Sequence, residues 1–396
     1  MLLIFFLTDH IKYQLFPSIN DYSITNYETQ DDELKSLSYD SLDETNDSNI
    51  SDSNFILCVG ECGPNNQLRD FVKCAIIAKL NNFTMIIPPF FPHYKSKKNL
   101  IRTIDQWYDI KELNKFVKTI SLVNFMQKNS GSQSTFLIDC YVQRYDQWEP
   151  RKLYAQRSIA FIQNQFGKYL SFRQFLDSSR NETLDQHFAS MKNCSSIFLH
   201  FFSHSLNRYV RPRSDYLRGI FQNLKRRSFI QDFAQQIIKE IPNLMINNGS
   251  IHRKLLTNLS VIHLRQGDRI VMNTTDFINQ ILYLMSIGVQ FTHFHLMSPY
   301  LTPEDIQLFQ DRLSLPFSTT NMLMHYIDSS HDTFFFDILE QEIAFQAPIF
   351  IGSPKSTFSA TVLLQRIHQK KEKSYIFSKI PNGTAYKATR VNFGYH

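Results

Sequence analysis

The stretch Leu259–Ile270 reads LSVIHLRQGDRI and changes character in its middle. Its first half is a short apolar run of β-prone residues, whereas its second half carries His263, Arg265 and Asp268. Buried strands of α/β domains are apolar runs of this kind, and such domains bind ligands just beyond the carboxyl ends of their strands. We therefore expect a buried strand over residues 260–264, followed by a ligand-binding loop.

Arg265 is the residue of this loop best suited to hold an anionic ligand. A guanidinium presents a fixed fork of donors that matches two phosphate oxygens at once. The alternative is that the charges of the loop reach solvent or pair with each other, and this motif alone favours that alternative. Two further stretches of the chain change the balance.

The composition limits the possible functions. At 396 residues the chain exceeds the size at which a single hydrophobic core usually stops growing, so two domains are expected. The net charge of +6 is mild, and the basic clusters at 95–98 and 211–227 lack a nucleic-acid-binding motif, so a solvated surface explains them better. The five cysteines include no C-x-x-C pair, which argues against a zinc or redox site, and their odd number leaves at least one thiol unpaired in a monomer.

The asparagine sequons, rather than the N-terminal segment, carry the hint of a secretory-pathway protein. The apolar run MLLIFFL is short for a signal-peptide core and lacks a basic start, so residues 1–16 predict a weak signal peptide or the remnant of an anchor. Residues 17–54 are polar and acidic and predict a disordered stem. No other stretch approaches the ~20 apolar residues of a membrane span. Nine N-x-S/T sequons add a hint of glycosylation: Asn46, Asn49, Asn82, Asn181, Asn193, Asn248, Asn258, Asn273 and Asn382.

Residues 55–87 predict a βαβ unit of a parallel sheet. A strand at 55–59 is followed by a turn-rich loop, a helix at 68–80 and a second strand at 84–87. The loop brings backbone N–H groups to a helix N-terminus, which is a natural anion site. Its two glycines, however, form neither a G-x-G-x-x-G motif nor a P-loop.

The rest of the chain predicts further α/β layers. Two domains are expected, at 55–245 and 246–396, each with a parallel sheet. The strands at 55–59 and 84–87 should share the first sheet, and those at 260–264 and 348–352 the second. The other predicted elements are strands at 136–140, 197–202 and 291–297, a largely helical region at 150–195, and helices at 228–241, 277–287, 332–345 and 356–366, with one starting at 302–305.

Three stretches, in the same order, resemble the GDP-fucose protein O-fucosyltransferases and their relatives. The first is GPNNQLRD at 63–70 with the strand that ends in Pro88-Pro89, and the second is HLRQGD at 263–268. The third is FIGSPKSTFS at 350–359, with Glu340-Gln341 before it and Arg366 after it.

The resemblance has three departures. Pro64 and Asn65 make the first loop irregular, which leaves open by one residue whether Asn65 or Asn66 matches the asparagine of the family. Glu340 stands where the family usually has Asp, and residues 90–250 match only weakly.

The resemblance implies a GT-B fold, in which two facing Rossmann-like domains hold GDP-fucose mainly on the C-terminal domain and the acceptor in the cleft. It also implies inverting transfer without a metal or other cofactor. The expected acceptors are Ser or Thr hydroxyls of folded, disulfide-rich domains, EGF-like or thrombospondin-type repeats, in the lumen of the endoplasmic reticulum or Golgi. Two alternatives remain open: a fucosyltransferase that acts on a glycan, and an inactive relative that binds only a nucleotide or a protein.

The resemblance assigns donor binding to Arg265, Ser356, Thr357 and Phe358, and the first three suit the diphosphate. Breaking a sugar–phosphate bond builds negative charge on the departing diphosphate, which a metal ion or a fixed cation must stabilise. No DxD-type carboxylate cluster stands near the strand ends, so Arg265 is the natural substitute for a metal. Ser356 and Thr357 open a helix after a strand, where hydroxyl and N–H groups suit phosphate oxygens, although a plain helix cap is the alternative.

The remaining donor contacts implied are His263, Asp268 and Glu340. His263 either touches the donor or is satisfied by a neighbouring carbonyl. Asp268 either accepts from the ribose, the guanine or Arg265, or orients the loop through a salt bridge. Glu340 is placed near the guanine, because a carboxylate can accept from both N1–H and N2–H₂.

Two residues of the first loop are the candidates for the acceptor side. Asn66 would orient the acceptor hydroxyl or the leaving oxygen. Glu61 is the only acid in that loop and the candidate general base, although its spacing differs from the family by about two residues; the alternative is a solvated loop residue.

Overall fold

The computed structural model describes most of the chain after residue 53, and the described residues belong to one compact unit that begins at Ser53. The expected segment at 1–16, nearly all of the stem at 17–54 and the boundary expected at 245/246 lie outside the described residues. The described ranges are 54–60, 63–91, 101–129, 135–144, 149–167, 169–178, 191, 193–200, 214–241, 259–265, 273–298, 301–313, 315–323, 333–353, 356–371, 373–379 and 386–390.

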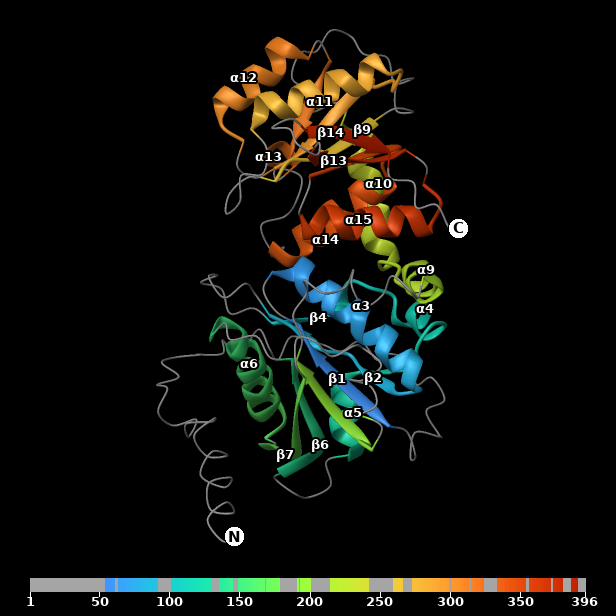
Figure 1. Cartoon of the computed structure of the whole chain (residues 1–396), viewed down its shortest axis with the longest axis vertical. Helices are drawn as coiled ribbons and strands as arrows, with labels where there is room; N and C mark the ends of the chain where they lie inside the picture. The colour runs from blue at the N-terminus through green and yellow to red at the C-terminus, as the bar shows by residue number, and fades with distance from the viewer. Residues whose placement is uncertain are drawn as a thin grey trace, which may run out of the picture. The chain divides into compact units, whose positions relative to one another are not determined.

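The first sheet has six parallel strands in the order β5-β2-β1-β8-β6-β7 (Figure 1). The predicted parallel pairing of the first two strands is confirmed, because Ile56 of β1 lies beside Met85 of β2. The strands are β1 Phe55–Val59, β2 Thr84–Ile86, β5 Thr119–Ile120, β6 Thr135–Arg144, β7 Tyr169–Ser178 and β8 Ser196–His200. A short antiparallel pair, β3 Pro89–Phe90 and β4 Arg102–Thr103, stands apart from the sheet.

The helix that follows β1 begins earlier than predicted. α3 spans Pro64–Asn81, because Pro64 occupies the first helical position, where no N–H is needed. Asn82 ends the helix in the left-handed region, and its N–H donates to the carbonyls of the last turn. The other helices of this part are α4 Ile110–Asn114, α5 Leu122–Asn129, α6 Glu149–Phe166, α9 Ser214–Asn223 and α10 Ser228–Glu240, with a 3₁₀ turn at Ile104–Gln106.

The prediction of a largely helical region at 150–195 is wrong in its second half. α6 ends at Phe166, Gly167 follows with φ +62°, and β7 then runs parallel to β6 along the edge of the first sheet. A positive φ suits glycine because it has no Cβ. The aromatic residues of β7 favour a strand once β6 offers a partner, and such a tertiary contact is invisible to local periodicity.

The second sheet has the order β11-β10-β9-β12-β13-β14, and only the β13–β14 pair is antiparallel. β9 begins one residue before the predicted start, and Val261 lies beside Phe350 of β12 in the parallel register that the sequence predicted. The two predicted pairs of strands therefore lie in two separate sheets. The strands are β9 Leu259–His263, β10 His293–Met297, β11 Phe317–Thr319, β12 Ile349–Gly352, β13 Ser374–Lys379 and β14 Tyr386–Arg390.

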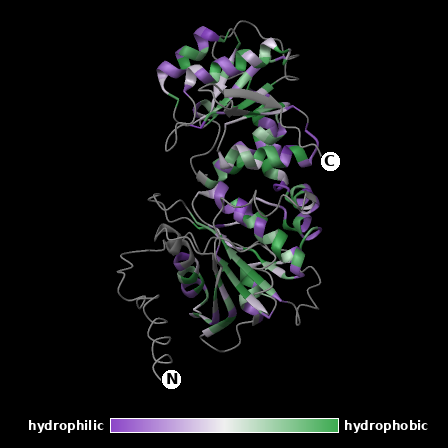
Figure 2. Cartoon of the chain, viewed as in Figure 1, coloured by the Kyte–Doolittle hydropathy of each residue, from purple (hydrophilic) through white to green (hydrophobic). Residues whose placement is uncertain are grey.

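Helices cover both faces of the second sheet, and the strands carry many of the most hydrophobic residues (Figure 2). α11 and α12 pack on the face that includes Ile262 and Phe294, whereas α14 and α15 pack on the face that includes Val261 and Phe350. The predicted helix start at 302–305 is confirmed, and Thr302 caps α12 in a capping box with Asp305. The helices are α11 Thr274–Ser286, α12 Pro303–Arg312, α13 Thr320–Leu323, α14 Thr333–Gln346 and α15 Thr357–His368.

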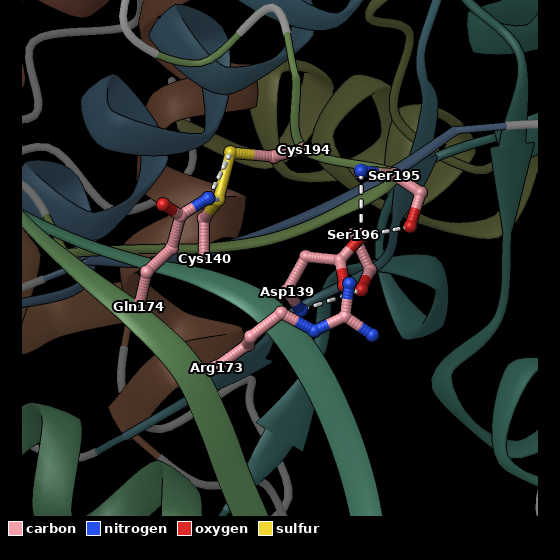
Figure 3. Close-up of a disulfide and its surroundings, with 7 residues drawn as sticks. All are labelled: Asp139, Cys140, Arg173, Gln174, Cys194, Ser195 and Ser196. Carbon is pink, nitrogen blue, oxygen red and sulfur yellow. Dashed lines mark hydrogen bonds and ion pairs between the residues drawn. A yellow bond between two sulfur atoms is a disulfide. The ribbon is translucent and has the colours of Figure 1, made fainter.

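Two disulfides cross-link the first sheet. Cys58 of β1 bonds to Cys74 of α3, and Cys140 of β6 bonds to Cys194, just before β8. Figure 3 shows that the second disulfide lies beside a polar cluster in which the Asp139 carboxylate accepts from the N–H and hydroxyl of Ser195. The sequence predicted neither pairing.

Within the described ranges, no helix has the length and apolar content that crossing a bilayer requires.

Candidate active site

The Ser353 hydroxyl ties the carboxyl ends of β9 and β12 together. It donates to the carbonyl of His263 at 2.6 Å and accepts from the backbone N–H of Arg265 at 2.9 Å. Ser353 is buried, so these bonds are shielded from competing water. The backbone of Arg265 is thereby held where it leaves the sheet, at the edge where the sequence predicted a ligand.

His263 is held from two sides by α15. Its Nδ1 lies 2.9 Å from the Ser359 hydroxyl, and its ring stacks on Phe358 with the centroids 4.5 Å apart. Burial, with a contribution from the charge of Arg265, lowers the pKa of His263 to about 3. The imidazole is therefore neutral at physiological pH, and its partner is a hydroxyl rather than the carbonyl considered from the sequence.

The N-terminus of α15 lies at the same carboxyl edge. The Ser356 hydroxyl accepts from the N–H of Ser359 at 3.3 Å, so Ser356 is the cap of the helix. Thr357 and Phe358 form the first turn, where the helix dipole is positive. Ser359 in turn accepts from the N–H of Ser353 at 3.0 Å, which joins the helix to the end of β12.

Glu340 lies on α14 and is buried. Its Oε1 accepts from the hydroxyl of Thr320, 2.6 Å away, and Thr320 directly follows β11 at the carboxyl edge of the second sheet. Burial, helped by the nearby Asp337, raises the pKa of the Glu340 carboxyl to about 8. The protonated form of this carboxyl therefore predominates at neutral pH.

The first turn of α3 distinguishes its two asparagines. Asn65 Oδ1 accepts from the Gln341 side chain of α14 at 2.5 Å. Asn66 Oδ1 is buried and has no hydrogen-bond partner among the described residues. The amide oxygen of Asn66 therefore has an unused capacity to accept within the described residues, whereas the amide oxygen of Asn65 is occupied.

Gln67 and Gly60 lie in close contact where the end of β1 approaches α3. The Gln67 amide donates to the Phe91 carbonyl at 2.6 Å and accepts from its N–H at 2.9 Å, as a strand neighbour would. A Cβ on Gly60 would lie 2.8 Å from the Cα of Gln67, so only glycine fits the exit of β1.

The structure brings together only part of the predicted set. His263, Arg265, Ser356, Thr357 and Phe358 lie around the ends of β9 and β12, whereas Glu61 and Asp268 lie outside the described residues. Ser353 and Ser359 were missed as site residues, although both lie inside the third motif. Among the described residues, no group of three or more His, Cys, Asp or Glu side chains could hold a metal ion.

Comparisons with known proteins agree with this architecture. The family described as GDP-fucose protein O-fucosyltransferase matches residues 55–285, more than half of the chain. POFUT1 in complex with GDP is 14% identical, with a TM-score of 0.53 over 80% of this chain and 95% of that one. POFUT1 in complex with GDP-fucose is 13% identical, with the same TM-score and coverage. NodZ α-1,6-fucosyltransferase soaked with GDP-fucose is 12% identical, with a TM-score of 0.48 over 86% of this chain and 100% of that one. No curated protein matches the sequence.

The likeness to POFUT1 concerns the fold and confirms the predicted α/β architecture of GT-B type. The family match covers the first sheet, β9 and the second motif, and it ends before the third motif. The chain therefore belongs to the GDP-fucose protein O-fucosyltransferase family, and it is a glycosyltransferase.

Proposed function

We propose that the protein transfers fucose from GDP-fucose to a Ser or Thr hydroxyl of a folded secretory-pathway domain, with inversion and without a metal ion. The observation that carries the proposal is the anchored Arg265 backbone beside the N-terminus of α15. That edge gathers positive charge and polar hydrogens, as a leaving diphosphate requires. The GDP and GDP-fucose complexes of POFUT1, which shares the fold, support the choice of donor.

The donor side stabilises the leaving group. Arg265 pairs with the diphosphate oxygens as the C1–O bond to phosphate breaks, and the first turn of α15, with Ser356, Thr357 and Phe358, receives part of the same charge. His263 is neutral, so it contributes a hydrogen bond rather than a second charge. Asp268 is proposed to orient this loop or to accept from the ribose.

The acceptor side has two named residues. The Asn66 side chain, whose Oδ1 has no hydrogen-bond partner among the described residues, orients the acceptor hydroxyl toward the fucose carbon with the hydroxyl proton facing the base. The hydroxyl oxygen forms the new bond to C1, its proton passes to a base, and GDP departs with the electrons of the old bond. Glu61 is the proposed base, because it is the only acid in the loop that precedes Asn66.

The proposed compartment is the lumen of the endoplasmic reticulum or Golgi. Two disulfides that tie the first sheet to neighbouring segments, together with nine sequons, fit an oxidising, glycosylating environment. The proposed acceptors, EGF-like and thrombospondin-type repeats, are themselves disulfide-rich domains of that environment.

The decisive experiment is a transfer assay with labelled GDP-fucose and a panel of folded EGF-like and thrombospondin-type repeats, with and without a chelator. We expect label on a Ser or Thr of one repeat class, with the anomeric configuration inverted and no loss of rate in the chelator. Label on glycans alone would support the glycan alternative. GDP binding without transfer to any acceptor would support the inactive relative.

Glu340 predicts a pH-dependent preference for guanine. An ionised carboxylate accepts from guanine N1–H and N2–H₂, but burial keeps Glu340 protonated below about pH 8. GDP binding should therefore release a proton and strengthen as the pH rises from 6 to 8, while UDP binding stays weaker and flat. Calorimetry in buffers of different ionisation enthalpy measures the released proton.

The Glu340 carboxyl also makes the stability of the free protein depend on pH, in the opposite direction to GDP binding. Its pKa is raised in the folded state, so the stability it contributes is complete below the unfolded value near 4.5 and is lost as the pH rises through about 8. Glu340→Gln should remove the proton release and the preference for GDP over UDP, and Asp311→Asn, an exposed acid, should change neither. Equal binding of GDP and UDP by the wild type would contradict the role given to Glu340.

Gly352 allows a test of the carboxyl edge of the second sheet, where β12 meets α15. A Cβ at this position would lie 2.8 Å from the Cβ of Ser359, so Gly352→Ala should push α15 away from His263. Such overpacking costs roughly 1–3 kcal/mol of unfolding free energy. We expect weaker GDP binding in calorimetry together with that loss. Gly219→Ala on α9 is the matched control, because the new Cβ would lie 2.7 Å from the Phe116 ring. The proposal predicts a similar destabilisation of the control with unchanged GDP affinity.

A further inference from the structure

Arg226 lies between α9 and α10, and its buried guanidinium, which is 2% exposed, contacts two helices of the second sheet. Its Nη1 donates to Glu342 of α14 at 2.7 Å. Its Nη2 donates to Gln341 of α14 at 2.9 Å and to Gln365 of α15 at 3.1 Å. The charge is therefore paired with one carboxylate and two amide oxygens.

The backbone around Arg226 is attached to the part of the chain between β4 and α4. The N–H of Arg227 donates to the Trp107 carbonyl at 2.8 Å, and the N–H of Asp109 donates to the Lys225 carbonyl at 2.8 Å. The guanidinium also lies over the ring of Tyr108, 5.6 Å from its centroid. The position of Arg226 is thus set independently of α14 and α15.

Gln341 uses both ends of its amide in this network. Its Oε1 accepts from Arg226, and its Nε2 donates to Asn65 at 2.5 Å. It directly follows Glu340, whereas Asn65 directly precedes Asn66. One fully buried amide therefore connects the helix of the proposed guanine contact with the helix turn of the proposed acceptor contact.

We infer that Gln341 is a positioning residue, which fixes the first turn of α3 relative to α14 and so aims the Asn66 amide at the reacting hydroxyl. This inference rests on the proposed function. A displacement of about 1 Å at a reacting group lowers turnover by up to ~10²-fold, so a single bond of this kind is enough to matter.

The alternative role for Gln341 is only to satisfy Arg226. Truncation of Gln341 leaves the guanidinium with Glu342 and Gln365, so that role predicts a change in stability without a specific change in turnover. The two roles differ in what Asn65 does. If Gln341 acts through Asn65, the substitutions of the two residues slow turnover by similar factors that do not add.

The test is a double-mutant cycle between Gln341→Met, which keeps the volume of the side chain, and Asn65→Ala. For each variant we would measure kcat and KM for fucose transfer, GDP affinity by calorimetry, and the melting temperature. We expect each single variant to lose about 10–10²-fold in kcat with GDP affinity within about 3-fold of the wild type. The double variant should be no slower than the slower single variant.

Two further variants separate positioning from folding. Asn65→Asp keeps an acceptor for the Gln341 amide and should recover most of the lost kcat. Gln346→Ala removes an amide from the same helix that donates to Glu342 at 2.8 Å and to the Gln231 carbonyl at 3.0 Å. It should lower the melting temperature at least as much as Gln341→Met while kcat stays unchanged.

The outcomes are distinguishable. Wild-type kcat in a folded Gln341→Met protein, or losses that add in the double variant, would overturn the positioning role while the proposed function stands. A wild-type protein that binds GDP but transfers fucose to no acceptor would overturn both.

Discussion

Arg265→Ala is expected to lower the turnover of fucose transfer by about 10²–10³-fold, while GDP affinity falls much less. The reason is that the diphosphate carries more negative charge in the transition state than in bound GDP-fucose, so the guanidinium binds the transition state more tightly than the bound donor. Arg265→Lys keeps the charge but loses the two-pronged donor, and it should recover little of the rate. Initial rates over a range of GDP-fucose concentrations, with calorimetry of GDP, measure the two effects separately.

The fold of the Arg265→Ala protein should survive. The bond to Ser353 uses the backbone N–H of residue 265, which alanine retains, and β9 is held by the buried Val261 and Ile262. A thermal melt checks this, and Arg312→Ala, an exposed arginine on α12, is the control for loss of a positive charge. Near-wild-type turnover in a well-folded Arg265→Ala protein would refute the proposed mechanism.

Arg366→Met is expected to cause the largest loss of stability, about 3–5 kcal/mol of unfolding free energy. Arg366 is fully buried, and its guanidinium donates to the carbonyls of Ala344, Phe345 and Ala347, which end α14, and to those of Pro348 and Lys373. A sixth bond goes to the Ser374 hydroxyl. Burial lowers the Arg366 pKa to about 10, so the group stays charged at neutral pH.

Methionine fills similar space but leaves several buried carbonyls at the negative end of a helix without a donor. Urea unfolding at pH 7, followed by tryptophan fluorescence, measures the loss. Lys373→Met removes an exposed charge beside the same turn and should change stability little. A loss below about 1 kcal/mol for Arg366→Met would show that water replaces the missing bonds and that the cluster is not a structural anchor.

The sequence predicted the parts of the fold that are encoded locally. The apolar runs at β1, β9 and β12 and the start of α12 appear where expected, because each depends on neighbours in the chain. β7 was missed because its pairing with β6 is a tertiary contact. The start of α3 was placed late because Pro64 reads as a loop residue until its position at the first turn is known.

In the candidate site, too, the sequence predicted the residues that local patterns mark and missed the contacts between distant parts of the chain. Arg265 and Ser356 were found because strand ends and helix starts mark ligand sites in α/β domains. The hydroxyl of Ser353, however, joins His263 and Arg265 across about 90 residues of chain, and that contact exists only because β12 lies next to β9. The choice between Asn65 and Asn66 likewise required Gln341, which no local pattern connects to them.

The strand order of the first sheet also has a consequence for synthesis. β8 is the last of its strands to leave the ribosome, yet it lies between β1 and β6, which precede it. In a nascent chain that ends before Ser196, the middle of the sheet is therefore incomplete. The edges of β1 and β6 that pair with β8 in the folded protein lack that partner. Unpaired edges of this kind are prone to aggregation. The bond between Cys140 and Cys194 closes next to the inserting strand, so the formation of this disulfide and the completion of the sheet are coupled steps of folding.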